Sequence, residues 1–251
     1  LHWNATLEPP LYSQFAGMLA GFVFAAILLL LSNPPKGDTK RIVTSLNILV
    51  VTLLCLILAS FLYGIAAAFS GSDYQQLTGV AYIHNAIACY MLAVGSMMLF
   101  YSIPCLMYDY DISLIDAKYV LIVFTVISFI VPVFVASTTG YVAYLLKFSF
   151  WKEWHPLVSD TPFLAALLFP PLLSTVVKWF HTRHRLLWLK HSLPHPNSTA
   201  LTLAIAIVSL HALAACYPPN IIGSLHPQVL QVIFIVLLLG LGSLIAATTS
   251  H

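Results

Sequence analysis

The chain has 251 residues, of which 60% are hydrophobic and only 7% are charged. Soluble domains carry about a quarter charged residues, so this composition excludes a water-soluble fold of this size. The net charge of +2 is too small to favour nucleic acid as a partner. We therefore predict an all-α, polytopic transmembrane helix bundle that lies in a plasma or inner membrane.

Seven apolar segments are long enough to cross the hydrocarbon core of a bilayer, which takes about 20 residues. In chain order they are residues 12–32, 42–69, 79–103, 117–146, 162–177, 198–216 and 228–248. None of the ten Lys+Arg or eight Asp+Glu residues falls in the body of a segment. The connections are short, so residues 1–251 are expected to form a single transmembrane domain.

Basic residues concentrate in the odd-numbered connections. Those of the first and fifth connections are Lys36, Lys40, Arg41, Lys178, Arg183, Arg185 and Lys190. The opposite side holds only Lys147 and Lys152. Because cytoplasmic loops carry an excess of Lys and Arg, this asymmetry predicts that the N-terminus lies outside and the C-terminus in the cytoplasm.

Close helix packing is indicated by small residues at four-residue spacing. Gly17 and Gly21 form such a pair in the first segment, and Gly64 and Ala68 form another in the second. Small residues at this spacing allow helix backbones to approach closely in a membrane. We expect packing within the chain, with contact between copies in a homo-oligomer as the alternative.

With no charge inside the segments, function has to depend on neutral polar side chains. The candidates are Gln14, Asn47, His84, Asn85 and His211. The predicted threading gives His84 and His211 a shared depth near the outer face, where Gln14 also lies. Two imidazoles at one depth are compatible with an interhelical hydrogen bond, a polar path, a metal site or haem ligation. Haem is disfavoured because the same helices hold no further histidines.

The fifth connection combines a histidine stripe with basic and apolar residues. Its candidate surface residues are Lys178, His181, Arg183, His184, Arg185, Trp188, Lys190 and His191. A basic amphipathic helix that rests on anionic lipid headgroups explains this pattern. A metal site at His181 and His184 is the alternative, although the neighbouring cations oppose metal binding.

No hydrolase, protease or nucleotide-binding motif is present, so we expect no enzymatic activity and no cofactor. Asp109 and Asp111 form an Asp-x-Asp pair, but a magnesium-diphosphate site needs further acidic clusters. The sequence therefore predicts a channel or passive transporter for a neutral or weakly charged solute. The alternative is a non-catalytic subunit that anchors partner membrane subunits; a haem protein or a lipid-modifying enzyme is the third class.

Overall fold

A computed structural model describes residues 8–34, 39–70, 75–109 and 196–216 of the chain. It also describes seven single residues, which are Val126, Ile233, Val236, Leu237, Gly240, Ser243 and Leu244. The long helices of this part are α1 (Glu8–Ser32), α2 (Thr39–Ser70), α3 (Gln75–Asp109) and α7 (Pro196–Cys216). These described residues are helical apart from Asn33 and Pro34, as expected for an all-α protein.

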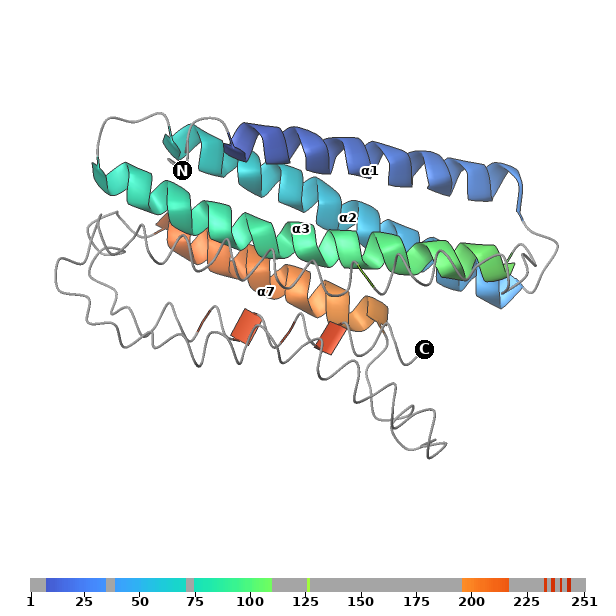
Figure 1. Cartoon of the computed structure of the whole chain (residues 1–251). Helices are drawn as coiled ribbons and strands as arrows, with labels where there is room; N and C mark the ends of the chain where they lie inside the picture. Colours follow the sequence, from blue (N-terminus) through green and yellow to red (C-terminus); the bar gives the residue numbers. More distant parts are fainter. Residues whose placement is uncertain are drawn as a thin grey trace.

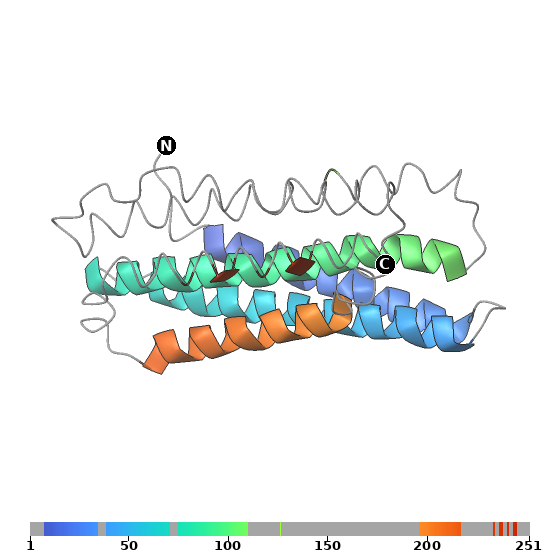
Figure 2. The same ribbon diagram turned by 90° about the horizontal axis from the view of Figure 1, so that it is seen from below.

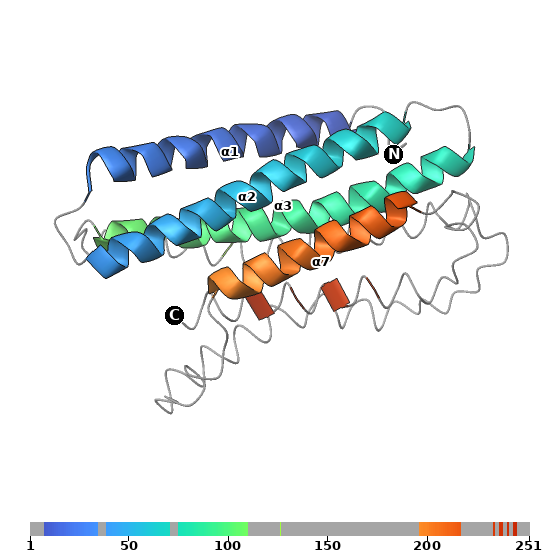
Figure 3. The same ribbon diagram turned by 180° about the vertical axis from the view of Figure 1, so that it is seen from behind.

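The four helices lie side by side with their long axes close to parallel (Figures 1 and 2). α1 packs on α2, α2 packs on α3, and α7 packs on α3 and more weakly on α2. Following the colours along the chain, each helix runs antiparallel to the one before it (Figures 1 and 3). The beginnings of α1 and α3 therefore lie at the same end of the bundle as the ends of α2 and α7.

Proline marks three of the helix boundaries. α1 begins at Glu8-Pro9 and α7 begins at Pro196, where the missing amide proton costs nothing because the first turn has no partner for it. α1 ends before Pro34, and its last turn closes with a 2.9 Å bond from the Asn33 amide to the Leu29 carbonyl.

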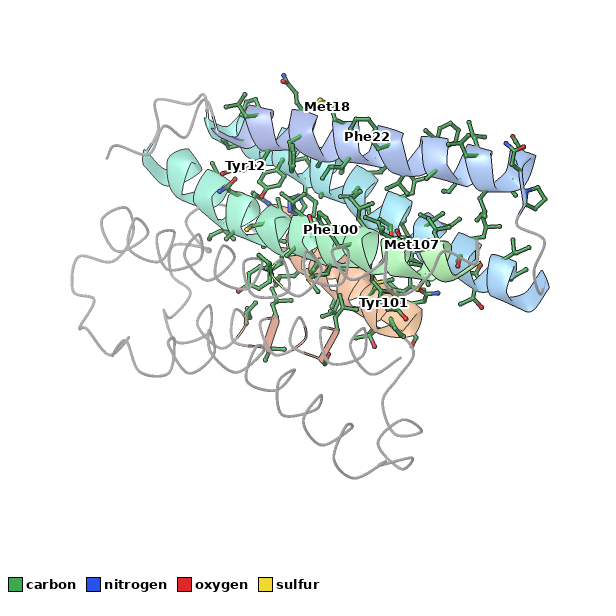
Figure 4. All side chains as sticks on the ribbon, turned by 45° about the vertical axis from the view of Figure 1, so that its right-hand side comes forward. Tyr12, Met18, Phe22, Phe100, Tyr101 and Met107 are labelled. Atoms are coloured by element: carbon green, nitrogen blue, oxygen red, sulfur yellow. The ribbon has the colours of Figure 1, made fainter. Side chains whose placement is uncertain are left out.

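α1 buries one narrow stripe and exposes the rest. The stripe recurs at steps of four and three residues and consists of Ala16, Ala20, Val23, Ile27 and Leu30. Large apolar side chains cover the opposite face, including Met18 and Phe22, which are 60% and 70% exposed and point away from the other helices (Figure 4). Such a face is unfavourable in water and favourable against lipid tails.

Within the described residues, three helices are long and apolar enough to cross a membrane. They are Pro9–Ser32, Ile42–Ala68 and Ile83–Met107. The apolar part of α7, Pro196–Ala212, is shorter. Together with the exposed apolar face of α1, these helices indicate a membrane location and fit an integral membrane protein.

α3 forms the centre of the described bundle. Every side chain from Ile83 to Gly95 is buried. α3 lies close to α2 at Gly95, where an added Cβ would lie 2.8 Å from Cδ2 of Leu56. Real Cβ atoms do not come this close to their neighbours, so a side chain at position 95 would force the buried Leu56 to shift.

The predicted small-residue pairs are only partly used inside the chain. An added Cβ at Gly17 would lie 3.5 Å from the Ser60 hydroxyl, and one at Gly64 would lie 4.0 Å from the Ser13 hydroxyl. Gly21 has no neighbour within 4 Å of such an atom. Packing among the described helices therefore accounts for Gly17 and Gly64 and gives no role to Gly21.

Two boundaries of the predicted segments differ from the helices. Lys40 and Arg41, which were assigned to the first connection, lie in the first turn of α2. Asp109 lies beyond the predicted segment 79–103 but is the last residue of α3. α3 continues past residue 103 because Cys105 and Leu106 still pack on the core. Most of the predicted segments 117–146, 162–177 and 228–248 lies outside the described residues.

Candidate functional site

A buried histidine pair joins α3 to α7. The Nδ1 atoms of His84 and His211 lie 3.0 Å apart, within hydrogen-bonding distance. The two ring centroids are 4.2 Å apart and the ring planes are tilted by 60°. Both residues are buried, with 0% and 5% of their surfaces exposed. The structure thus brings together two histidines that were predicted only to share a depth in the membrane.

Helical periodicity explains how α7 directs His211 into the bundle. The buried face of α7 recurs at steps of four, three and four residues and consists of Ala200, Ala204, Ile207 and His211. Two alanines on this face allow α7 to lie close to α3. Because the two helices are antiparallel, the end of α7 meets the beginning of α3, and His211 reaches His84 (Figure 3).

The short distance between the Nδ1 atoms constrains the protons of the pair. One Nδ1 has to carry the shared hydrogen and the other has to accept it through its lone pair. The accepting ring is therefore neutral and carries its proton on Nε2. Either histidine can be the donor, because the geometry is compatible with both tautomer assignments.

Two polar atoms at the pair are buried and lack a hydrogen bond in the described part of the chain. They are Nε2 of His211 and Oδ1 of Asn85. Asn85 is 2% exposed and directly follows His84 on α3. A buried polar atom without a partner costs free energy, so polar atoms of this kind are typical of sites that bind a ligand or water.

A tyrosine and cysteine group connects the histidine level of α3 to α1 and α2. Tyr12 of α1 stacks on Tyr63 of α2 with ring centroids 5.4 Å apart. Tyr63 is in turn hydrogen-bonded to Cys89 of α3. Figure 4 shows Tyr12 directed from α1 toward the neighbouring helices. Cys89 lies one helical turn from Asn85, so this group and the histidine pair occupy neighbouring turns of α3.

Two serines link α1 and α2 reciprocally. The Ser13 hydroxyl donates to the Ser60 carbonyl at 2.8 Å, and the Ser60 hydroxyl donates to the Ser13 carbonyl at 2.9 Å. The two hydroxyl oxygens are 3.3 Å apart. Gly17 and Gly64 each follow one of these serines by four residues, so their missing side chains make room for the contact.

These contacts form one layer across the described helices, which we call the polar belt. Its members are Tyr12, Ser13, Ser60, Tyr63, His84, Asn85, Cys89 and His211. On α3 it extends from His84 to Cys89, about 7.5 Å along the helix axis at 1.5 Å per residue. The belt lies toward the end of the bundle at which α1 and α3 begin.

Comparison with protein-family models, with curated proteins and with solved structures found no match to this chain. Any functional conclusion about the protein therefore rests on the polar belt and its surroundings.

Two of the predicted candidates do not belong to the belt. Gln14 is exposed on α1, and Asn47 is exposed on α2. Gln14 follows Ser13 directly, but the next position on a helix points about 100° away from it. In the described residues Gln14 therefore lies on the exposed side of α1, apart from the buried histidines. The basic segment from Lys178 to His191 lies outside the described residues.

Sequence reasoning missed Ser13, Ser60, Tyr63 and Cys89. A signal for the serines was present, since Ser13-x-x-x-Gly17 and Ser60-x-x-x-Gly64 have the same spacing. Small residues four apart mark close helix contacts in membranes, and serine at one of the two positions adds an interhelical hydrogen bond.

The geometry of the pair also bears on haem. Axial imidazoles of a haem bind the iron from opposite faces of the porphyrin, so the macrocycle separates them. The Nδ1 atoms of His84 and His211 are in hydrogen-bond contact, which leaves no room for a porphyrin between the rings. The described arrangement does not fit bis-histidine haem.

The serine contact gives a first prediction on stability. Ser13→Ala and Ser60→Ala are each expected to lower the free energy of unfolding by about 0.5–1.5 kcal/mol, the range of interhelical hydrogen bonds in membranes. The double variant should lose slightly less than the sum, because the 3.3 Å contact between the two hydroxyls is already lost in either single variant. Unfolding by SDS titration of the purified protein measures these differences.

Thr202→Ala provides the matched control for the serine variants. Its hydroxyl donates to the Ser198 carbonyl of the same helix at 2.8 Å and is exposed. We expect its removal to change the free energy of unfolding by less than about 0.5 kcal/mol. A strictly additive serine double variant would show that the two hydroxyls do not stabilise one another.

Proposed function

We propose that the protein is an integral membrane protein that passes a small neutral or weakly charged solute, with the polar belt as the binding point. The single observation behind this proposal is the buried group of His84, Asn85 and His211 in a core whose described residues are mostly apolar. Polar side chains inside a membrane are costly and are typical of substrate and ion pathways. We further propose seven spans, with the N-terminus outside and the C-terminus in the cytoplasm.

The chemistry of the belt favours a solute that forms hydrogen bonds. Nε2 of His211 and Oδ1 of Asn85 are buried positions without a partner in the described helices, so a polar solute or water would satisfy them. Within the described residues the acidic side chains are Glu8 and Asp109, which begin α1 and end α3. The belt thus supports a neutral or weakly charged solute better than coupling to protons through a carboxylate.

The proposed role is tested by flux in liposomes. We expect purified wild-type protein to accelerate entry of at least one of water, urea and glycerol, as measured by light scattering after an osmotic step. His84→Ala and His211→Ala should each change the rate at least about fivefold, since both remove a binding group in the path. Thr202→Ala, on the exposed face of α7, should leave the rate unchanged.

Folded His84→Ala and His211→Ala proteins with wild-type rates would discard the belt as a path. Folding is checked by circular dichroism and gel filtration in detergent. Absence of flux in the folded wild type, for every solute tried, would count against transport altogether and in favour of the second candidate.

The second candidate is a non-catalytic subunit that anchors partner membrane subunits. The outer face of α1 favours it, since Phe15, Met18 and Phe22 are exposed beside Gly21, which has open space around it. A photo-crosslinking residue at Phe22 is expected to form a protein adduct in cells if this candidate holds. The same residue at Val50, on the exposed side of α2, is the control.

For the basic segment from Lys178 to His191 we propose contact with anionic lipid headgroups at the cytoplasmic face. Its charge and its histidine and tryptophan stripe support this role. We also propose that the protein is not an enzyme, because its sequence holds no catalytic motif.

A further inference from the structure

Two imidazole nitrogens of the polar belt converge in the core of the described bundle. Nδ1 of His84 and Nδ1 of His211 are 3.0 Å apart and point toward one another across the contact of α3 with α7. Two nitrogens bound to one metal ion lie about 2 Å from it, and hence about 3–4 Å from each other, depending on the angle at the ion. Small rotations of the two rings would therefore admit an ion in place of the shared hydrogen.

The proton balance of this exchange is simple when both rings are neutral. The ring that carries hydrogen on Nδ1 moves it to its own Nε2, so that both Nδ1 lone pairs face the ion. No proton has to leave the pair. When His211 is the donor, its own Nε2 receives the proton. This atom is buried and accepts no hydrogen bond from the described residues.

Charge decides which ions the pair can hold. The described segments carry acidic residues only at Glu8 and Asp109, and neither falls within the buried stretch of α3. The cost of moving an ion out of water rises with the square of its charge, so a divalent ion costs about four times as much as a monovalent ion of equal radius. A site of neutral ligands in an apolar bundle consequently favours a monovalent ion.

The donor atoms narrow the choice further. Imidazole is a ligand of copper and zinc, whereas Na⁺ and K⁺ prefer oxygen ligands. The face of α3 that carries His84 continues through Met91 and Met98 at seven-residue steps, and both methionines are fully buried. Thioether sulfur selects Cu⁺ among the biological metals. The buried donors of this face are thus soft or borderline and uncharged.

We propose that His84 and His211 form a binding site for Cu⁺. The site would hold the ion between the two Nδ1 atoms, with the ring of each histidine kept in place by the packing of α3 against α7. Met91 lies about 10.5 Å from His84 along the axis of α3, so it is not part of this site but offers a second soft position on the same face. Binding is a property of the folded bundle and does not depend on passage of a solute.

The test is an anaerobic Cu⁺ titration of the full chain in detergent, purified without a polyhistidine tag. The chelator bicinchoninate competes for the ion and reports the copper that the protein retains. We expect the wild type to hold one Cu⁺ per chain. In His84→Ala and in His211→Ala the affinity for this ion should be at least tenfold weaker, so that bicinchoninate removes it. His251→Ala, which removes a histidine from the end of the sequence, should retain that ion.

Equal copper retention by the wild type and both pair variants would overturn the assignment, as would a pair that holds Zn²⁺ in preference to Cu⁺ in a parallel titration. If an alanine variant does not fold, His84→Asn and His211→Asn keep a polar group of smaller size and take its place. X-ray absorption at the copper edge gives an independent readout. It should show two nitrogen neighbours, and a spectrum with sulfur neighbours alone would contradict the site.

Discussion

Gly95→Leu is expected to disrupt the contact between α2 and α3 and to lower the free energy of unfolding by about 3 kcal/mol or more. A Cβ atom alone would lie 2.8 Å from Cδ2 and 3.0 Å from Cγ of Leu56, and 3.4 Å from Cβ of Cys55. Leu56 and Cys55 are both fully buried, so neither side chain can move into open space. Overpacking of a dense core costs about 1–3 kcal/mol for small additions and more for large ones.

Matched variants test whether the loss of stability is specific to position 95. Gly21→Leu on α1 introduces the same side chain where nothing lies within 4 Å, and we expect a change within about 0.5 kcal/mol. Gly95→Ala should fall between the two. Combining Gly95→Ala with Leu56→Ala should cost less than the sum of the single changes, because the smaller residue 56 makes room for the new methyl group.

The series is measured by SDS titration or thermal scanning of the purified protein. Similar losses for Gly95→Leu and Gly21→Leu would mean that the backbones of α2 and α3 are not held as closely as described. An additive result for the Gly95 and Leu56 pair would lead to the same conclusion.

Replacement of both histidines of the belt is expected to cost less than replacement of one. His84→Leu or His211→Leu alone removes one side of the 3.0 Å hydrogen bond, which leaves the other Nδ1 buried without this partner. The expected loss is about 1–3 kcal/mol for each single variant. Replacing both partners by apolar groups removes the polar atoms themselves, and such exchanges are close to neutral or stabilising.

This double-variant cycle separates stability from function. We expect the His84→Leu/His211→Leu protein to be folded and about as stable as the wild type, yet to have lost Cu⁺ binding. Thr202→Leu, on the exposed face of α7, is the control for adding leucine to that helix. If the double variant is destabilised by the full sum of the single losses, the two rings do not interact in the folded protein.

The sequence predicted the helical membrane architecture because composition and segment length are sufficient for it. It also predicted that His84 and His211 lie at the same depth in the membrane, because the depth of a residue follows from its distance along the span from the end of that span. It could not show that they touch, because their contact depends on which helices are neighbours. That information lies in the packing of α7 on α3, where Ala200, Ala204 and Ile207 form the buried face of α7.

The sequence also could not predict which side chains of each helix are buried and which are exposed. α1 is apolar on all sides, so no amphipathic pattern distinguishes its buried stripe from its lipid-facing surface. Gln14 was therefore assigned to the site although it is exposed, while Ser13 beside it was overlooked. Gly95 was missed for a similar reason, since it has no partner at four-residue spacing and its importance comes from Leu56 on another helix.

The central position of α3 has a consequence for how the protein is made. α3 is the least apolar of the three membrane-length helices, and 78% of its apolar window is buried, against 28% for α1 and 44% for α2. A span that carries His84 and Asn85 gains less from lipid contact than its neighbours do. Insertion of α3 into the bilayer during synthesis should therefore depend on α2, which is translated first and packs on α3 at Gly95. We expect a chain without residues 39–70 to leave α3 partly uninserted, whereas α1 would still enter the membrane by itself.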